Sequence, residues 1–451
     1  MTHWGRRSLM LAVTFLAIAL AVSPAAAGAA EPLPRIEGPL TMEQAVGQAL
    51  EKSIRIKAAD ADSRTMDSMR KEALAPFWPQ LSANGYLNAQ RLGPNVYTSA
   101  GNTMARNYQV FSPDYNRDAN ITVMYSLFAG GRDYYGYKAA AARADAARAM
   151  SQGTGLDVAM QTRLDYIASL REAENARVTG DLLKAVEERL RVTHEMFEAG
   201  RVPRYYLLRD ETERANAVQM DAMAKSREEQ ALIALKTTMG VDLSSSITLA
   251  DRLEYTAMKV SIEEGIRQAS DTHPEIQAAV KQREAMVAEV RAAYSNYFPQ
   301  ISGAFMNDWV WMRNQGEART TDNGYSVGLV VTLPIFDGFM RENGVNTAKA
   351  KLEKVAQVEA LVRQQVAKEV NQAALMLGAA EKGVEASKIG LDQAEEEIRI
   401  VKERFESGRG IQVEILDAQA SVTRARFNLV AALADYNAAL AMWLKATGRV
   451  R

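Results

Sequence analysis

The chain carries the same order of motifs twice. Three pairs of segments match: 77–82 (FWPQLS) with 297–302 (YFPQIS) at an offset of 220 residues, and both 128–130 (FAG) with 336–338 (FDG) and 197–201 (FEAGR) with 405–409 (FESGR) at an offset of 208. Ordered matches over nearly the whole chain indicate an internal duplication. A fold for this chain must therefore build one structural unit twice.

Each repeat has the same predicted plan. We place the first repeat at residues 31–240 and the second at 241–451. In each repeat a helix is followed by a β-hairpin, a long helix, a Gly-containing turn and a last helix. The predicted ranges are 41–75, 81–128 and 133–196 in the first repeat and 261–295, 301–334 and 341–404 in the second, with the last helices ending near Gly240 and Gly448. The segments 41–44 (TMEQ) and 261–264 (SIEE) fit capping boxes at the first helices.

The predicted helix lengths favour an elongated molecule. At 1.5 Å per residue, a helix of 64 residues is about 96 Å long, and the two shorter helices placed end to end nearly match it. The helical segments are rich in Ala, Glu, Lys, Gln and Arg, which is typical of coiled coils. A helical scaffold would explain these segments equally well, but it leaves the strands unexplained.

Residues 1–30 read as a secretory signal peptide. Arg6 and Arg7 precede an apolar run at 9–22, and small residues at 25–30 offer cleavage sites. A membrane anchor is the alternative, but the apolar run is short for a spanning helix. We find no later apolar run of spanning length, so a membrane crossing would have to use β-strands.

Four segments in the hairpins alternate between apolar and polar residues, and each is about the length of a tilted membrane strand. Tyr86, Trp309, Trp311 and Tyr325 are candidates for an aromatic belt at the membrane interface. The connections at 91–118 and 312–323 are expected to be exposed loops. A small soluble sheet is the alternative. Since four strands cannot close a barrel and lipid does not tolerate open edges, the membrane reading requires several copies of the chain.

Composition excludes several classes of function. The chain has no Cys and three His, which excludes thiolate sites and disfavours a metal site, so no cofactor is expected. The formal net charge of −1 argues against a nucleic-acid partner. The sequence has no G-x-x-x-x-G-K-[ST] motif and no evident nucleophile–base pair, so we predict that the protein is not an enzyme.

The duplicated order of motifs resembles the TolC family of outer-membrane efflux and secretion channels over about residues 36–450. The resemblance implies an α+β membrane protein: a long helical, coiled-coil barrel in the periplasm, joined to a transmembrane β-barrel that a homotrimer shares, with four strands from each protomer. It also implies a location in the outer membrane of a Gram-negative bacterium. The implied partners are outer-membrane lipid, a periplasmic adaptor protein and an inner-membrane pump of the RND or ABC type.

The resemblance also suggests site residues. Glu414 and Asp417 match the family's constriction carboxylates and, being three residues apart, share a helix face. From the pattern alone, a solvated helix face is the alternative. Tyr206 and Arg209 occupy the matching positions of the first repeat, so Arg209 is a candidate partner for a gate carboxylate.

Other candidates lie at the two tip turns. Phe197 and Phe405 are candidates for packing at the closed tip, and Gly200, Arg201, Gly408 and Arg409 for contact with the adaptor. The predicted function is a passive exit duct for small molecules from a partner pump. Export of proteins or peptides, as in type I secretion, is one alternative, and a periplasmic coiled-coil scaffold is another. The sequence specifies neither the cargo nor the pump.

Overall fold

The computed structural model describes residues 33–89, 115–313, 320–407 and 409–449. The predicted signal peptide and most of the two predicted strand-connecting loops lie outside these residues. The helices are α2 (Met42–Lys52), α3 (Ile54–Glu72), α4 (Arg132–Glu198), α5 (Arg204–Met239), α6 (Ile262–Thr272), α7 (Pro274–Tyr294), α8 (Met340–Glu406) and α9 (Gln412–Ala446). The strands are β1 (Glu37–Leu40), β2 (Gln80–Ala89), β3 (Tyr115–Phe128), β4 (Ser246–Leu249), β5 (Gln300–Arg313) and β6 (Thr320–Thr332).

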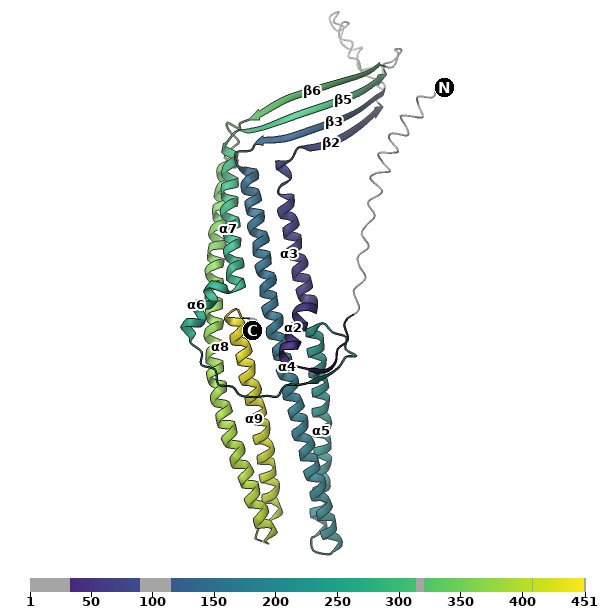
Figure 1. Cartoon of the computed structure of the whole chain (residues 1–451), viewed down its shortest axis with the longest axis vertical. Helices are drawn as coiled ribbons and strands as arrows, with labels where there is room; N and C mark the ends of the chain where they lie inside the picture. The colour runs from purple at the N-terminus through teal and green to yellow at the C-terminus, as the bar shows by residue number, and fades with distance from the viewer. Residues whose placement is uncertain (1–32, 90–114, 314–319, 408, 450–451) are drawn as a thin grey trace, which may run out of the picture.

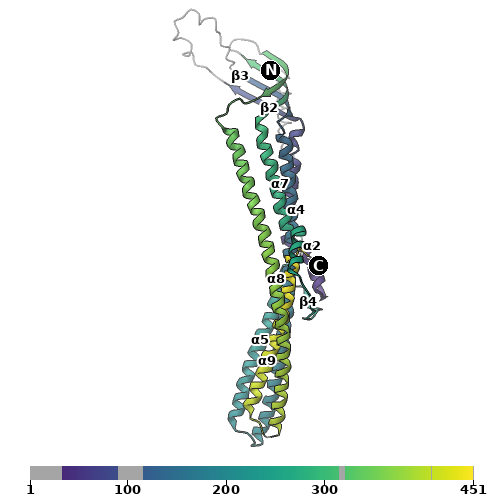
Figure 2. The same cartoon turned by 90° about the vertical axis from the view of Figure 1, so that its left-hand side faces the viewer.

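The two long helices set the dimensions of the molecule. α4 and α8 have 67 residues each, so each is about 100 Å long. A β-sheet lies at one end of the helices and two helix–turn–helix tips lie at the other (Figure 1). The view turned by 90° shows that the molecule is long and narrow (Figure 2). The predicted long helices are confirmed, to within two residues at each end.

The predicted continuous helices 41–75 and 261–295 are wrong, because each is split in two. Ser53 (φ −54°, ψ 129°) separates α2 from α3, and His273 (φ −67°, ψ 124°) separates α6 from α7. In the second repeat the cause is Pro274, which lacks an N–H group and forces the preceding residue out of the helical region. His273 then caps α7 by accepting the N–H of Glu275 at its Nδ1. No proline follows Ser53. We attribute the break there to the packing of another helix end against it.

Each break receives the end of another helix. α5 ends at Gly240 (φ 68°), and a Cβ atom at this position would lie 3.0 Å from the carbonyl oxygen of Lys52. α9 ends at Gly448 (φ 75°), which lies against the backbone of His273. α5 and α3 both pack along α4, and α9 and α7 both pack along α8. Two shorter helices therefore line one long helix in each repeat, as the lengths predicted.

The four-stranded sheet has the order β2-β3-β5-β6 and is antiparallel throughout. β3 and β5 belong to different repeats, so their pairing joins the two hairpins. The strands extend into the predicted loops 91–118 and 312–323, since β3 begins at Tyr115 and β6 at Thr320. β2 and β6 stand at the two edges of the sheet.

A second, smaller sheet ties the repeats together halfway along the helices. β1 pairs in parallel with β4, and the hydroxyl of Tyr166 on α4 lies 2.7 Å from the carbonyl oxygen of Leu40. The following linker crosses to the second repeat. There Tyr436 and Asn437 of α9 donate hydrogen bonds to the carbonyl oxygens of Thr256 and Glu254.

One described helix, α9, is long and apolar enough to cross a membrane by length and composition, with a mean hydropathy of 1.2 over its best window. The expectation that no apolar run after the signal peptide reaches membrane-spanning length is therefore wrong. α9 packs against α8 and α4, and its Tyr436 and Trp443 are buried. These contacts place α9 in the helical bundle.

Candidate functional site

The tip of the first helical hairpin is closed by a backbone motif that needs glycine. Gly200 follows α4 with φ 69°, a conformation that costs side-chain-bearing residues about 1 kcal/mol. The Arg201 N–H donates to the Met196 carbonyl at 2.8 Å, and the Gly200 N–H donates to the Phe197 carbonyl at 2.9 Å. These bonds form a Schellman cap. Gly200 and Arg201 are both exposed at this turn.

The second tip has a similar cap. The Arg409 N–H donates to the Arg404 carbonyl at 2.9 Å, and Arg409 is exposed. Gly408 lies outside the described residues. Gly410 packs on the backbone of Phe405, which a Cβ atom would approach to 3.0 Å. Phe405 and its counterpart Phe197 are both half-buried.

Glu414 and Asp417 occupy successive turns of α9 just inside the second tip. Glu414 is half-buried, and its Oε1 lies 3.8 Å from Nη2 of Arg404 on α8. Its Oε2 is buried without a hydrogen-bond partner. Asp417 is exposed. Arg404 was not predicted as a partner, because only the folded hairpin brings α8 and α9 together.

Arg209 does not pair with a carboxylate in the described part of this chain, where it is exposed on α5. The rings of Tyr205 and Tyr206 stack at the start of the same helix, with centroids 4.4 Å apart. A hydrogen bond with Tyr206 raises the pKa of Tyr205. The structure therefore brings Glu414 to Arg404 within one hairpin rather than to Arg209 across two.

A fully buried carboxylate, which sequence reasoning missed, joins the two tips. Asp210 on α5 is 0% exposed. It accepts hydrogen bonds from Arg189 Nε at 3.0 Å and Thr193 Oγ1 at 2.7 Å, both on α4. Gln412 Nε2 of α9 donates to both carboxylate oxygens, at 3.3 and 3.2 Å. We call Asp210, Arg189, Thr193 and Gln412 the tip node.

The tip node fixes the first residue of α9. Gln412 stands two residues before Glu414, so the node determines where the candidate carboxylates begin on α9. The sequence does contain a signal that could have identified Asp210 as a buried residue, namely its spacing from the buried alanines of α5. It lies seven residues before Ala217 and fourteen before Ala224, both of which are buried on the inner seam of α5. A polar residue at such a seam position indicates a specific buried partner.

The sheet presents one apolar face that no element of the described residues covers. Side chains that are at least 70% exposed lie on this face, namely those of Leu81, Leu87, Tyr325, Val327 and Leu329. The strand register aligns Leu81, Val123, Phe305 and Val327 in one row on this side of the sheet. An apolar surface this extensive indicates contact with a membrane or a partner protein.

The opposite face of the sheet is polar. Asn84, Asn120 and Asp308 are direct neighbours across three strands, and Asn84 Nδ2 donates to Asn120 Oδ1 at 3.0 Å. Tyr86 pairs with Asp118 on this face, whereas Trp309, Trp311 and Tyr325 lie on the apolar face. Including Tyr86 in the aromatic belt was therefore wrong. Within the described ranges, no three His, Asp or Glu side chains gather as ligands for a metal ion.

Comparison with protein families gives one match that covers both repeats. The model of the family described as "Outer membrane efflux protein" matches residues 45–241 and 265–449. The two matched ranges together span most of the chain and include both tips.

Individual relatives and solved structures agree with this match. Protein CyaE of Bordetella pertussis is 26% identical over 372 residues, which cover 78% of this chain and 72% of CyaE. Outer membrane efflux protein BepC of Brucella suis is 24% identical over 291 residues, covering 64% and 60% of the two chains. The crystal structure of the outer membrane protein VceC from Vibrio cholerae superposes with a TM-score of 0.74 at 15% identity, covering 90% of this chain and 96% of VceC. The VceC likeness concerns the fold alone.

Proposed function

The chain belongs to the family of outer membrane efflux proteins, and from this premise we propose that three copies form a passive exit duct for small molecules. In this proposal the two repeats, 31–240 and 241–451, derive from one duplicated unit. The sheet crosses the outer membrane, and the helices reach into the periplasm. The observation that carries the proposal is the apolar face of the four-stranded sheet, which stays exposed within the described part of the chain.

The open sheet favours a shared barrel. A lone sheet with two edges would leave backbone N–H and C=O groups unpaired in lipid, at a cost of several kcal/mol for each group. Pairing β6 of one copy with β2 of the next removes both edges. In this arrangement the apolar face contacts lipid, and the polar face lines a water-filled lumen, as in other outer-membrane barrels.

The helical end serves as the docking end. We assign the adaptor contact to Gly200, Arg201, Gly408 and Arg409 at the two turns. A periplasmic adaptor and an inner-membrane pump of the RND or ABC type would supply the energy, since the sequence has no phosphate-binding loop.

The constriction is assigned to Glu414 and Asp417. Three copies would bring six carboxylates around the axis, and a ring of carboxylates favours cations over anions in a narrow pore. The Arg404–Glu414 distance of 3.8 Å supports a partly neutralised ring in this conformation. Arg209 remains a candidate partner in a different state of the tip.

Single-channel recording in planar bilayers tests the proposal. In a KCl gradient, the wild type should conduct with a reversal potential that indicates cation preference. The Glu414→Ala/Asp417→Ala variant should lose most of that preference. Glu211→Ala/Glu213→Ala is the matched control, because it removes two carboxylates from α5 at a similar depth and should keep the preference. Absence of channels from both wild type and a variant with a loosened tip would refute the duct.

A further inference from the structure

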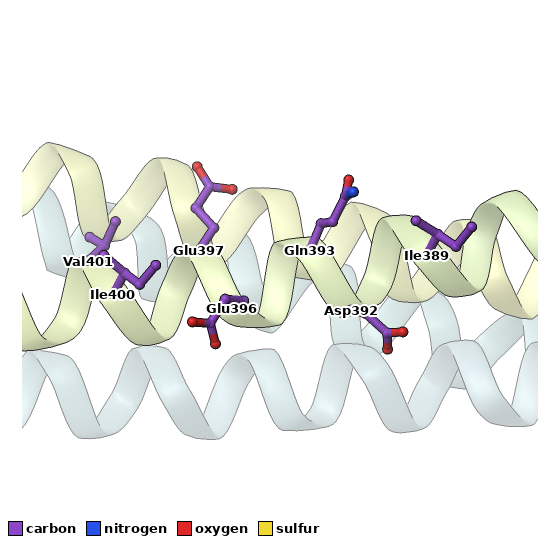
Figure 3. A pocket seen from close by; sticks show the side chains of 7 residues that line it. All are labelled: Ile389, Asp392, Gln393, Glu396, Glu397, Ile400 and Val401. Atoms are coloured by element: carbon purple, nitrogen blue, oxygen red, sulfur yellow. The ribbon is translucent and has the colours of Figure 1, made fainter.

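Two surfaces of the described chain carry charges of opposite sign beside apolar side chains. One is a shallow hollow of about 580 Å³, whose lining side chains all come from α8 (Figure 3). Asp392, Glu396 and Glu397 make this hollow negative, so it does not suit an anionic ligand. The other surface lies on the apolar face of the four-stranded sheet, and its charge is positive.

A row of four residues crosses the apolar face at the end of the sheet remote from the helices. The strand register aligns one residue from each strand, namely Leu87, Arg117, Trp311 and Thr321. We call these four residues the outer row. Arg117 and Trp311 are direct neighbours on the two central strands, β3 and β5, and both are exposed. This pair therefore belongs to a single copy of the chain.

Charge is divided between the two faces of the sheet. From the outer row to the row that contains Ile301 and Val331, Arg117 is the only charged residue that the register places on the apolar face of the described strands. The carboxylates of these strands lie on the polar face instead, namely those of Asp118, Asp308 and Asp322. The apolar face therefore ends, on its outer side, in a single positive charge.

The outer row lies about one membrane thickness from the helical end of the sheet. Thr321 stands ten residues before Val331 on β6. At about 3.4 Å per residue and a tilt of about 40°, the two rows are about 26 Å apart along the membrane normal. The apolar band of outer-membrane barrels is about 25 Å tall. Arg117 therefore stands at the level of the outer headgroups when the rows in between contact lipid.

This depth suits an arginine and a tryptophan that face lipid. A lipid-facing Arg is strongly destabilising at the midplane of the bilayer but almost neutral near the interface. Its guanidinium presents a planar fork of N–H donors that matches two phosphate oxygens. A Trp side chain is stable at the headgroup level, where its ring is apolar and its N–H is a donor. Together the two side chains offer what a phosphorylated headgroup requires.

We propose that Arg117 and Trp311 bind the phosphate group of an outer-leaflet lipid, with one lipid for each copy of the chain. The guanidinium of Arg117 pairs with the phosphate, and the acyl chains lie along the apolar rows that contain Ile121 and Phe305. This inference rests on the proposed membrane crossing of the sheet, and it names the class of lipid that contacts the outer end.

Native mass spectrometry of the full-length protein in detergent tests this contact, with diphosphoryl lipid A as the probe. The wild type should retain one tightly bound lipid for each copy of the chain. Arg117→Gln should bind the lipid roughly tenfold more weakly, because it loses a charge-assisted contact. Arg117→Lys keeps the charge but loses the planar fork, so its affinity should lie between the two. Trp311→Leu should weaken binding by less than Arg117→Gln does.

Arg132→Gln is the matched control. Arg132 is an exposed arginine at the start of α4, beyond the opposite end of β3. Its replacement removes the same charge from the chain at the other side of the sheet, so this variant should bind diphosphoryl lipid A as the wild type does. Lipid A from which both phosphates have been removed should bind weakly, and equally to the wild type and to Arg117→Gln.

Two results would overturn the lipid contact. The first is equal affinity of the wild type and Arg117→Gln for diphosphoryl lipid A. The second is displacement of the lipid by millimolar inorganic phosphate, which would assign Arg117 to a free anion. Neither result affects the membrane crossing, which spin labels along β6 test separately. Water accessibility of every label on β6 would overturn both the membrane crossing and the lipid contact.

Discussion

Removing the buried carboxylate of the tip node should loosen the tip of the helical bundle. In Asp210→Ala, Arg189 loses its only carboxylate partner within the described chain, and Gln412 loses both of its acceptors. Breaking a buried ion pair by removing one partner costs about 3–5 kcal/mol. The Arg189 side chain keeps 18% exposure, so water can partly solvate it and the lower end of this range applies. A cost of about 3 kcal/mol corresponds to a roughly hundredfold rise in the population of the locally opened tip.

Amide hydrogen exchange of the detergent-solubilised protein measures this population. Amides in the second turn of α5 and of α9 should exchange roughly a hundredfold faster in Asp210→Ala, while amides near the small sheet should be unchanged. Glu211→Ala, an exposed neighbour on the same helix, should behave as the wild type.

A fully apolar node should recover much of the protection, because replacing all members of a buried polar pair is often neutral. The second repeat already has Val401 and Ala418 at the positions of Thr193 and Asp210. The variant Arg189→Leu/Thr193→Val/Asp210→Ala/Gln412→Leu, in which Thr193→Val removes the hydroxyl that Asp210 accepts from, provides this comparison. Exchange within threefold of wild type in Asp210→Ala would refute the role of the node.

Two further predictions concern other parts of the fold. Burial lowers the pKa of His273 from its ordinary value of 6.5, so the unfolded chain binds more protons below that pH. Stability should therefore fall as the pH drops below about 6.5, by up to about 1.4 kcal/mol per pH unit. His273→Ser, which copies Ser53 of the first repeat, should flatten this dependence in thermal unfolding at pH 7 and pH 5, and a steeper dependence would contradict the argument. Gly130→Ala should lower the unfolding temperature far more than Gly338→Ala. Both glycines have positive φ, but a Cβ at Gly130 would lie 2.5 Å from the Ser295 carbonyl oxygen, whereas one at Gly338 meets nothing within 4 Å. Equal losses in the two variants would show that backbone strain alone matters.

The regular elements were predictable because their periodicity is long and consistent. Alternation of apolar and polar residues over about ten positions separates the two faces of each strand as the strand register has them. The 67-residue helices needed no tertiary information, since neither contains Pro and their interior glycines, such as Gly180 and Gly383, are too isolated to end a long helical pattern. The sequence itself marks the break at His273, because Pro274 follows it.

The misses share a physical cause, which is contact between segments distant in sequence. The helix breaks at Ser53 although no Pro or Gly stands beside it. The only sequence signal for this break is that Ser53 corresponds to His273 at the offset of 220. The predicted capping box at Ser261 is only half formed in the described structure. The Ser261 hydroxyl accepts the Glu264 N–H, but the Glu264 side chain pairs with Arg267 rather than with the Ser261 N–H. Likewise, the partners of Asp210 on α5 come from two other helices, α4 and α9, and no local pattern brings Arg189 and Gln412 together.

The proposed duct requires the sheet to cross a membrane with its apolar face toward lipid. Spin labels placed one at a time at residues 325 to 331 of β6, in protein reconstituted into vesicles, test it most directly. Accessibility should alternate with a period of two, so that labels at 325, 327, 329 and 331 are accessible to oxygen dissolved in lipid. Labels at 326, 328 and 330 should be accessible to a water-soluble nickel reagent. Water accessibility at every position, or no lipid accessibility at any, would contradict the membrane assignment and favour a periplasmic scaffold.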